Sequence, residues 1–215
     1  MGKTRTYDAD GISVTFDAAR CIHAAECVRG LPSVFDPERR PWIDPAGAGP
    51  DELAAVIRRC PSGALAYERS DGGPPEAPDT ENVVRVVPEG PLHVRGRLRV
   101  HVPGGEALDE TRVSLCRCGK SANKPFCDNA HLEVGFDDAG TVVERGLPEA
   151  DADAEVLEIS LSDNGPILLR GSFRVRGADA NVQGGRAALC RCGGSGTKPF
   201  CDGSHRDLGF EAAGG

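Results

Sequence analysis

The strongest constraint on this chain is an array of metal-binding side chains that occurs twice. In each copy, three cysteines and one histidine have the spacing C-x-C-x8-C-x3-H. One such array could arise by accident, whereas two arrays in register predict a repeated metal site. The donors are Cys116, Cys118, Cys127 and His131 in the first copy and Cys190, Cys192, Cys201 and His205 in the second.

The spacing divides each array into two pairs of donors. Residues two apart in an extended segment point the same way, so Cys116 and Cys118 can bind one iron through two thiolates. Cys127 and His131 have the i, i+4 relation of one helix face, so this pair is expected where a turn enters a helix. The second pair would close on a second iron, with backbone N–H groups of the helix start facing the anionic cluster.

The second array matches a known signature. The stretch CRCGGSGTKPFCDGSH resembles the CDGSH iron-sulfur domain of the mitoNEET-like family, with its signature C-x-C-x2-[ST]-x3-P-x-C-D-G-[STA]-H. The first copy, CRCGKSANKPFCDNAH, keeps every ligand and differs at Asn129 and Ala130, which stand where the family has Gly-Ser. The resemblance implies two 2Fe-2S clusters, one for each motif. Tandem motifs also resemble the monomeric branch of the family, in which one chain forms an internal pseudo-dimer.

Four further residues in the motifs are candidates for contact with the clusters. Ser121 and Ser195 are placed to hydrogen-bond cluster sulfur, and Lys124 and Lys198 to offset local negative charge. The alternative is that they only complete the turn or lie on the solvated surface.

Zinc and disulfides are the alternative uses of these cysteines. A set of three cysteines and one histidine can hold structural zinc, but the usual zinc spacing is C-x2-4-C rather than C-x-C. The chain has nine cysteines, an odd number, and no secretory signal precedes them. A reducing compartment is therefore expected, and disulfides are not.

The N-terminal third has a second kind of cysteine pattern. Cys21, Cys27 and Cys60 lie in CIHAAECVRGLPSVFD and RCPSGAL. The segment resembles the single-cluster ferredoxins of actinobacterial type and the divergent mono-cluster ferredoxin domain fused to CDGSH proteins. Bacterial ferredoxins have a further cysteine between the first two, at the place of Ala24. The resemblance implies a 3Fe-4S cluster, or a 4Fe-4S cluster with a non-cysteine fourth ligand, for which His23 is a candidate. Buried free thiols in a small core are the alternative.

Hydrophobic periodicity places strands and one helix around these sites. Ile12, Val14 and Phe16 alternate with polar residues as in a strand, and residues 51–59 have helical spacing of apolar residues, with acids in the first turn. Strands are also expected over 82–87, 91–100, 156–161 and the repeated run GPILLRGSFRV. Gly96 is expected to form a bulge, and His93 and His101 are expected on the solvent face.

These patterns predict an α+β chain with several small domains. We expect a ferredoxin-like domain over 1–70, a linker over 71–81, a first CDGSH repeat over 82–140, a linker over 141–154 and a second repeat over 155–215. The two repeats should form a β-rich unit with a pseudo-two-fold arrangement and short helices at the cluster sites.

Composition restricts the function. A net charge of −8 argues against a nucleic-acid partner. No apolar run of 18 residues is present, so no membrane span is expected. Because the start MGKTRTYDADG has no apolar signal region, a cytoplasmic location is expected.

The sequence motifs indicate the binding of iron-sulfur clusters rather than the turnover of a substrate. The sequence shows no phosphate loop, Ser-His-Asp set or flavin fingerprint, which predicts a protein that is not an enzyme. An electron carrier with a redox partner protein is the favoured function. The alternatives are cluster transfer to an apo iron-sulfur acceptor, redox or pH sensing, and a zinc-stapled interaction module.

Overall fold

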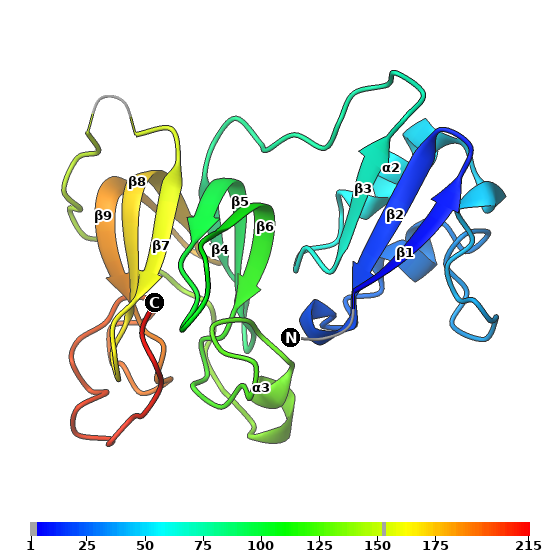
Figure 1. Ribbon diagram of the computed structural model, residues 1–215. Coiled ribbons are helices and arrows are strands. Elements are labelled where there is room, and N and C mark those ends of the chain that lie inside the picture. The colour runs from blue at the N-terminus through cyan, green and yellow to red at the C-terminus, as the bar shows by residue number, and fades with distance from the viewer. Residues whose placement is uncertain (1–3, 152–153) are drawn as a thin grey trace. The chain divides into compact units, whose positions relative to one another are not determined.

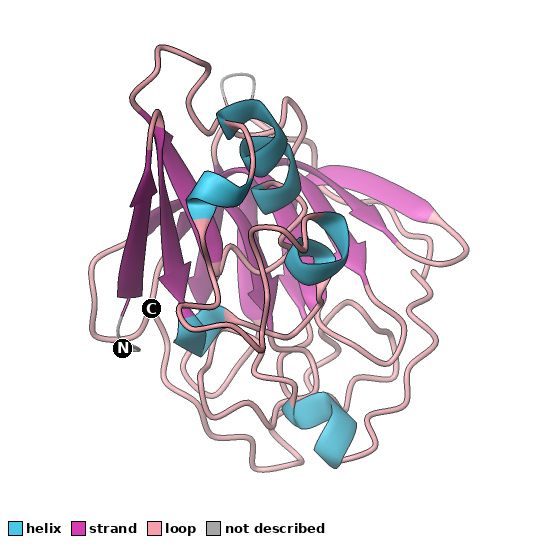
Figure 2. Cartoon of the chain, turned by 90° about the vertical axis from the view of Figure 1, so that its right-hand side faces the viewer, coloured by secondary structure: helices cyan, strands magenta, loops and turns pink. Residues whose placement is uncertain are grey.

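The computed structural model describes residues 4–151 and 154–215, and these divide into two compact units. The first unit extends to Ala77 and the second begins at Pro78. Strands dominate, and the helices are few and short (Figure 2). The predicted linker over 141–154 includes residues 152–153, which lie outside the described residues.

The first unit is a three-stranded antiparallel sheet with short helical segments (Figure 1). The strand order is β1-β2-β3, and residues Phe35, Ile43, Leu53 and Ile57 form part of the fully buried core against it. The elements in chain order are β1 (Thr4–Ala9), β2 (Ile12–Asp17), η1 (Ala18–Arg20), α1 (Glu26–Gly30), η2 (Pro45–Gly47), α2 (Pro50–Ile57) and β3 (Leu65–Arg69).

The helix α2 confirms the helical prediction for this segment. It begins with proline in its first turn, where the missing N–H costs no hydrogen bond, and Asp51 and Glu52 follow in that turn. Leu53, Val56 and Ile57 are buried. Burying each of these side chains contributes about 1.5–3 kcal/mol before entropy is counted. Because that apolar face packs on the sheet, the helix fixes the segment that ends at Cys60.

The second unit is a six-stranded sheet in which four strands close a ring. β4 pairs with β5, β5 with β7, β7 with β8, and β8 with β4, while β6 adds to β5 and β9 to β8. The strands are β4 (Val83–Val86), β5 (Leu92–Val100), β6 (Leu108–Leu115), β7 (Leu157–Leu161), β8 (Ile167–Arg176) and β9 (Asn181–Leu189).

The pairing between the two repeats is reciprocal. The first strand of each repeat, β4 or β7, pairs in parallel with the long strand of the other repeat, β8 or β5. Asn82 reinforces this exchange, because its side-chain amide donates to the carbonyls of Glu155 and Ser172 and accepts from the amide of Arg97. Neither repeat therefore completes the sheet by itself.

A glycine bulge lets each long strand serve both repeats. The register of β5 shifts between Arg95 and Leu98, and Gly96 has φ +136°, which confirms the predicted bulge. Residues 92–95 pair with β4, whereas residues 98–100 pair with β7. A Cβ at Gly96 would lie 2.1 Å from the side-chain oxygen of Asn82, so glycine is needed there. Gly171 has the same place in β8, with φ +128°.

The histidines of the first long strand differ in their surroundings. His101 lies towards solvent, as predicted, and its Nε2 is 2.7 Å from the Glu158 carboxylate. His93 lies on the same, less buried face of β5, and its half-buried ring has Nδ1 2.8 Å from the hydroxyl of Ser114. Burial lowers the pKa of His93 to about 4. Alternation along a strand identifies the face of a side chain but not what covers that face.

The segment between the repeats has no helix or strand over residues 141–151, yet it packs on the second unit. Val142 is buried in the core, and its amide donates to the Asp179 carboxylate. Leu147 packs against the core, and the carbonyl of Pro148 accepts from the amide of Gly185 in β9. Because the segment has few apolar residues, its sequence pattern did not predict these contacts.

Candidate metal centres

Each CDGSH-like array begins where a strand ends. Cys116 follows β6 and Cys190 follows β9. In both copies the chain then turns back and forms an isolated bridge, between Leu115 and Phe126 and between Leu189 and Phe200. The amides of the third cysteines, Cys127 and Cys201, donate to strand carbonyls, at 2.8 and 2.9 Å. This return brings the third cysteine beside the first two.

The donors of each array lie in two close pairs. The Sγ atoms of Cys116 and Cys118 are 3.8 Å apart, and those of Cys190 and Cys192 are 3.7 Å apart. Two thiolates on one tetrahedral metal, each at about 2.3 Å from it, lie about 3.8 Å apart. Each Cys-x-Cys pair is therefore already spaced to bind one metal.

The Cys-x3-His pairs have the matching geometry. The distance from Sγ to the histidine Nδ1 is 3.5 Å for Cys127 and His131 and 3.4 Å for Cys201 and His205. A metal bound to sulfur at about 2.3 Å and to nitrogen at about 2.1 Å would place these atoms about 3.6 Å apart. Nδ1 is thus the nitrogen that faces the metal. Among the described residues, no group of three or more His, Cys, Asp or Glu side chains is arranged around one ion.

Only the first array has the predicted helix at the histidine. α3 (Ala130–Glu133) begins directly before His131. The second array has a bend at 203 and turns over 204–209, so the prediction of a short helix is wrong there. Asn129 adopts a left-handed conformation with φ +72°, and Gly203 with φ +97°, so the Asn129 difference keeps the turn geometry. The amide of Asn129 donates to Cys127 Sγ at 3.4 Å.

Hydrogen bonds and burial set the charge states of the first array. The hydrogen bond from Cys116 lowers the pKa of Cys118 to about 6, while the same contact, with burial, raises the pKa of Cys116 above its usual range. Burial raises the pKa of Cys127 to about 11 and lowers the pKa of His131. A thiolate at Cys118 and a neutral imidazole are the forms that bind metal.

The motif serines make two kinds of hydrogen bond. Ser121 Oγ donates to the carbonyl of Phe126 at 2.7 Å, and Ser195 Oγ donates to that of Phe200 at 2.6 Å. The backbone amides of the two serines hydrogen-bond the sulfurs of Cys116 and Cys190, which favours the thiolate forms. The hydroxyls thus stabilise the turn, and the backbone amides hydrogen-bond the cysteine sulfurs.

The motif lysines also bind the backbone of the turn. Lys124 Nζ donates to the carbonyl of Ser121, and Lys198 Nζ donates to that of Ser195 at 2.6 Å. Both ammonium groups are thereby held beside their own arrays, where they add positive charge. Their role as compensating charges remains a prediction.

Two buried arginines are the site residues that the sequence reasoning missed. Arg117 and Arg191 stand between the first two cysteines of their arrays, and each is 1 % exposed. Arg117 donates to the carbonyls of Val87 and Gly90 and stacks over Phe136, 5.0 Å from the ring centroid. Arg191 has the same place, and its stacking partner is Phe210. The repeated C-R-C could have indicated them, since a residue between two inward thiols points the other way.

The two arrays touch each other through glycines. A Cβ built at Gly119 would lie 2.5 Å from the carbonyl oxygen of Cys192, and one at Gly193 would lie 2.6 Å from that of Cys118. Both glycines have left-handed backbones, with φ +80° and +85°. The first array therefore lies against the second along the backbone of their metal-binding loops.

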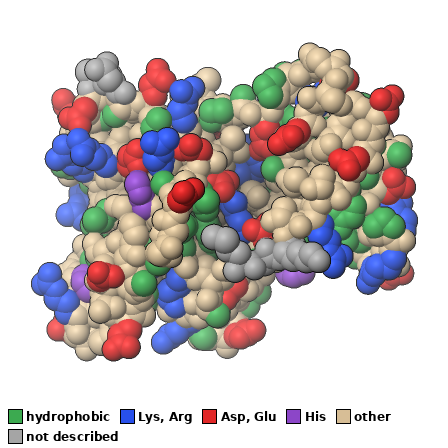
Figure 3. Space-filling model, in the orientation of Figure 1, with side chains coloured by type: hydrophobic (Ala, Val, Ile, Leu, Met, Phe, Trp, Pro, Cys, Tyr) green, Lys and Arg blue, Asp and Glu red, His purple; other side chains and the backbone are tan. Residues whose placement is uncertain are grey.

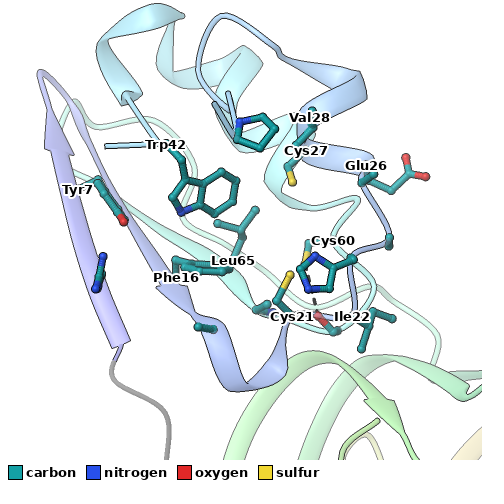
Figure 4. A pocket seen from close by; sticks show the side chains of 18 of the residues that line it. Tyr7, Phe16, Cys21, Ile22, Glu26, Cys27, Val28, Trp42, Cys60 and Leu65 are labelled. Carbon is teal, nitrogen blue, oxygen red and sulfur yellow. Dashed lines mark hydrogen bonds between the residues drawn. The ribbon is translucent and has the colours of Figure 1, made fainter. Parts of the chain in front are cut away.

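The three N-terminal cysteines come from separate segments and line one cavity of about 990 Å³ (Figure 4). Cys21 follows η1, Cys27 lies in α1, and Cys60 follows α2. Burial raises the pKa of Cys27 to about 11, and both Cys21 and Cys60 contribute through their charge. Mutual influence of this kind requires the three sulfurs to be near one another.

The loop between Cys21 and Cys27 has an unusual backbone. His23 and Ala25 adopt positive φ angles of 52° and 61° without being glycine. Such conformations cost about 1–2 kcal/mol each and concentrate at functional sites. The amide of His23 hydrogen-bonds Cys21 sulfur, while the His23 side chain is exposed and lines the cavity, as does Ala24. The strained loop thus turns an amide towards the first thiol.

The donor sets suit iron-sulfur clusters. Two metal-spaced pairs per array match a binuclear centre, and three neighbouring thiols match three corners of a cubane. The same separations within a pair also suit zinc, so the distances alone do not select the metal.

Comparisons with known proteins select iron. A family described as "Divergent 4Fe-4S mono-cluster" matches residues 7–70, and one described as "Iron-binding zinc finger CDGSH type" matches residues 89–132 and 164–206. "Uncharacterized protein YjdI" of Escherichia coli K12 is 42 % identical over 66 residues, which are 31 % of this chain and 87 % of that protein. Its counterpart from strain O157:H7 has the same identity and coverage.

Proposed function

Because the chain belongs to the iron-sulfur proteins that join a divergent 4Fe-4S mono-cluster domain to CDGSH-type iron-binding repeats, we propose that it is an electron carrier. The observation that carries this proposal is the backbone contact between the two CDGSH arrays at Gly119 and Gly193. Two redox centres held against each other in one unit can exchange electrons within the chain. A protein that only delivers clusters to an acceptor would not need its two arrays to be in contact.

The ligands in this proposal are the residues of the three sites. Cys116, Cys118, Cys127 and His131 hold one 2Fe-2S cluster, and Cys190, Cys192, Cys201 and His205 hold the other. Cys21, Cys27 and Cys60 hold a 3Fe-4S cluster, which becomes 4Fe-4S if a non-cysteine side chain such as His23 supplies the fourth ligand. Each cluster supplies one-electron redox chemistry when bound.

The chain's own residues set how readily each site accepts an electron. The imidazole ligand replaces a thiolate, so each array contributes one negative charge fewer than four cysteines would. Backbone amides donate hydrogen bonds to the sulfurs of Cys116, Cys118 and Cys190. Both effects favour electron uptake, as histidine ligation does in Rieske centres.

The proposed partner is a redox protein, and the two repeats form an internal pseudo-dimer within a monomer. The chain carries a net charge of −8, which favours a partner with a basic docking surface. Acidic and basic side chains are intermingled on the face in Figure 3. The docking surface is therefore expected to be a small area, in which a few charged side chains orient the partner protein. In the described residues no helix is long and apolar enough to cross a membrane.

Cluster transfer is the second candidate, favoured by the exposure of the second array. Cys192, Cys201 and His205 are half-buried, whereas all four donors of the first array are buried. A protonated histidine is a poor ligand, so His205 is the point from which the second site would release its cluster.

A cycle of reduction and reoxidation separates the two functions. The anaerobically purified protein is reduced with dithionite and reoxidised by a one-electron acceptor protein in the presence of an apo-ferredoxin. An electron carrier completes repeated cycles while its iron and sulfide stay bound. If iron and sulfide move to the apo-ferredoxin during a cycle, and if H205C stops that movement, transfer is the function and the electron-carrier proposal is wrong.

A further inference from the structure

The two CDGSH arrays differ in how the buried arginine beside each one is neutralised. Arg117 forms an ion pair with the carboxylate of Asp138. The side chain of Arg117 is 0 % exposed and that of Asp138 14 % exposed, so water screens this pair little. The amide of Gly140 also donates to Asp138, at 3.0 Å, which holds the carboxylate in place.

Arg191 has the equivalent place in the second array without the carboxylate. Its guanidinium donates to the carbonyls of Ser162, Gly165, Ala212 and Ala213, at 2.7 to 3.1 Å. Among residues 4–151 and 154–215 no ion pair of Arg191 with a carboxylate is found. Asp138 lies two residues after Phe136, and the residue two after Phe210 is Ala212. Desolvation by burial lowers the pKa of Arg191, although the charges of Cys116 and Asp163 act to raise it.

The other charged side chains near the arrays do not restore the balance. Asp163 is close enough to Arg191 to influence it electrostatically, but its side chain is exposed and therefore screened by solvent. Lys120 lies in the first array and Arg206 directly follows His205 in the second. Both are exposed, and they add one positive charge to each array. The buried carboxylate of Asp138 is the difference that solvent screens least.

We propose that Asp138 makes the Cys116–His131 site the more difficult of the two CDGSH sites to reduce, so that an electron settles first on the Cys190–His205 site. The inference rests on the proposed electron-carrier function and gives the internal transfer a direction. Reduction adds one negative charge to a site. The Asp138 carboxylate opposes that charge at the first site. Arg191, which lies near Cys116 as well as within its own array, has no buried carboxylate paired with it among the described residues. The greater burial of the donors in the first array acts in the same direction, because burial disfavours added charge.

The test is a potentiometric titration of the full holoprotein with dithionite, followed by electron paramagnetic resonance and visible absorption. Each histidine-ligated site takes up one electron from the reductant. H131C and H205C assign the two signals, because each changes the spectrum of one site. The expected result is two midpoints, separated by on the order of tenfold in the reduction equilibrium, which is 59 mV for a one-electron couple, with the first array lower.

Two reciprocal substitutions examine the cause. D138N should raise the midpoint of the first site towards that of the second, and A212D should lower the midpoint of the second site. D137N is the matched control, because it removes the same charge from the exposed neighbouring residue and should leave both midpoints unchanged. A212D keeps the proposal testable if D138N fails to fold.

The outcomes separate this inference from the proposed function. If both histidine-ligated signals are present but share one midpoint, or if D138N and A212D act no more strongly than D137N, the inference is overturned and the electron carrier stands. If the protein yields no histidine-ligated 2Fe-2S signal, the proposed function itself fails.

Discussion

At the scale of single residues, the metal ligands depend on side chains that bind no metal. The arginine between the first two cysteines joins three segments in each repeat, which are the hairpin before the motif, the motif and the tail after it. Arg117 reaches Val87 and Gly90 on one side and Asp138 on the other. Because the guanidinium is fully buried, each of these groups would lose a hydrogen bond or an ion pair without it.

Replacing each of the two arginines should lower the free energy of unfolding by a different amount. R117M leaves the buried Asp138 carboxylate unpaired, and breaking a buried pair costs about 3–5 kcal/mol. R191M removes hydrogen bonds to backbone carbonyls alone, at about 1–3 kcal/mol. Urea unfolding of the anaerobic holoprotein measures both, with R206M as an exposed control. Equal losses for R117M and R191M would show that the Arg117–Asp138 pair adds nothing.

The half-buried His93 predicts a pH dependence of stability. Its pKa is lowered to about 4 in the folded protein, against about 6.5 in the unfolded chain. Between these values the unfolded chain binds more protons, so the free energy of unfolding falls as pH decreases from about 6.5 towards 4. H93Q keeps a side chain that can hydrogen-bond Ser114 and removes the titration. The free energy of unfolding should therefore fall less in H93Q than in the wild type between pH 7 and pH 5.5, and parallel losses would refute the assignment.

At the scale of elements, the contact between the two metal-binding loops is the feature with the tightest steric requirement. Gly119 and Gly193 each combine a positive φ with a backbone carbonyl of the other loop within 2.6 Å of the position of a Cβ. A side chain at either residue must push the loops apart. The strands that carry these loops belong to different repeats, with β6 paired to β5 and β9 paired to β8.

G119A should therefore cost more than a left-handed alanine alone. The left-handed conformation costs about 1–2 kcal/mol, and the clash with Cys192 adds about 1–3 kcal/mol. G135A provides the matched control, because Gly135 has φ +59° and nothing lies within 4 Å of its Cβ position. Thermal unfolding of the two variants measures the difference. Similar losses in G119A and G135A would mean that the loops separate freely.

The sequence predicted local elements better than contacts between them. The alternation in residues 92–100 and the apolar spacing around Leu53 and Ile57 identified β5 and α2, because one buried face leaves a periodic pattern. The strand β9, with its glycine pair at 184–185, has a weak pattern and was missed. The parallel pairing of β4 with β8 joins residues about ninety apart, which no local pattern records.

The candidate sites were predicted in the same uneven way. Ligand spacing is a local property, so the donors could be identified from the sequence, and the structure places them in metal-spaced pairs. The partners of Ser121 and Arg117 depend on the return of the chain, so the carbonyl partner of the hydroxyl and the role of the guanidinium were not predicted. Asp138, the partner of Arg117, lies in the segment after the first motif, which has no hydrophobic periodicity.

At the scale of the whole molecule, the chain carries three sets of metal-binding donors in two compact units. The first unit holds three thiols at a strained loop, and the second holds two histidine-containing arrays in backbone contact. A cubane-type site and two histidine-ligated sites have different ranges of potential. The proposed function would use this difference to pass single electrons between centres of unequal potential.

The most direct test of this account is a count of iron, acid-labile sulfide and zinc per chain, on protein purified without oxygen. The proposed clusters correspond to about 7 iron and about 8 sulfide per chain, or about 8 iron if the first site holds 4Fe-4S. C60S should lower the count to about 4 of each, because the two CDGSH sites do not use Cys60. Zinc without sulfide in the purified chain would contradict the central claim.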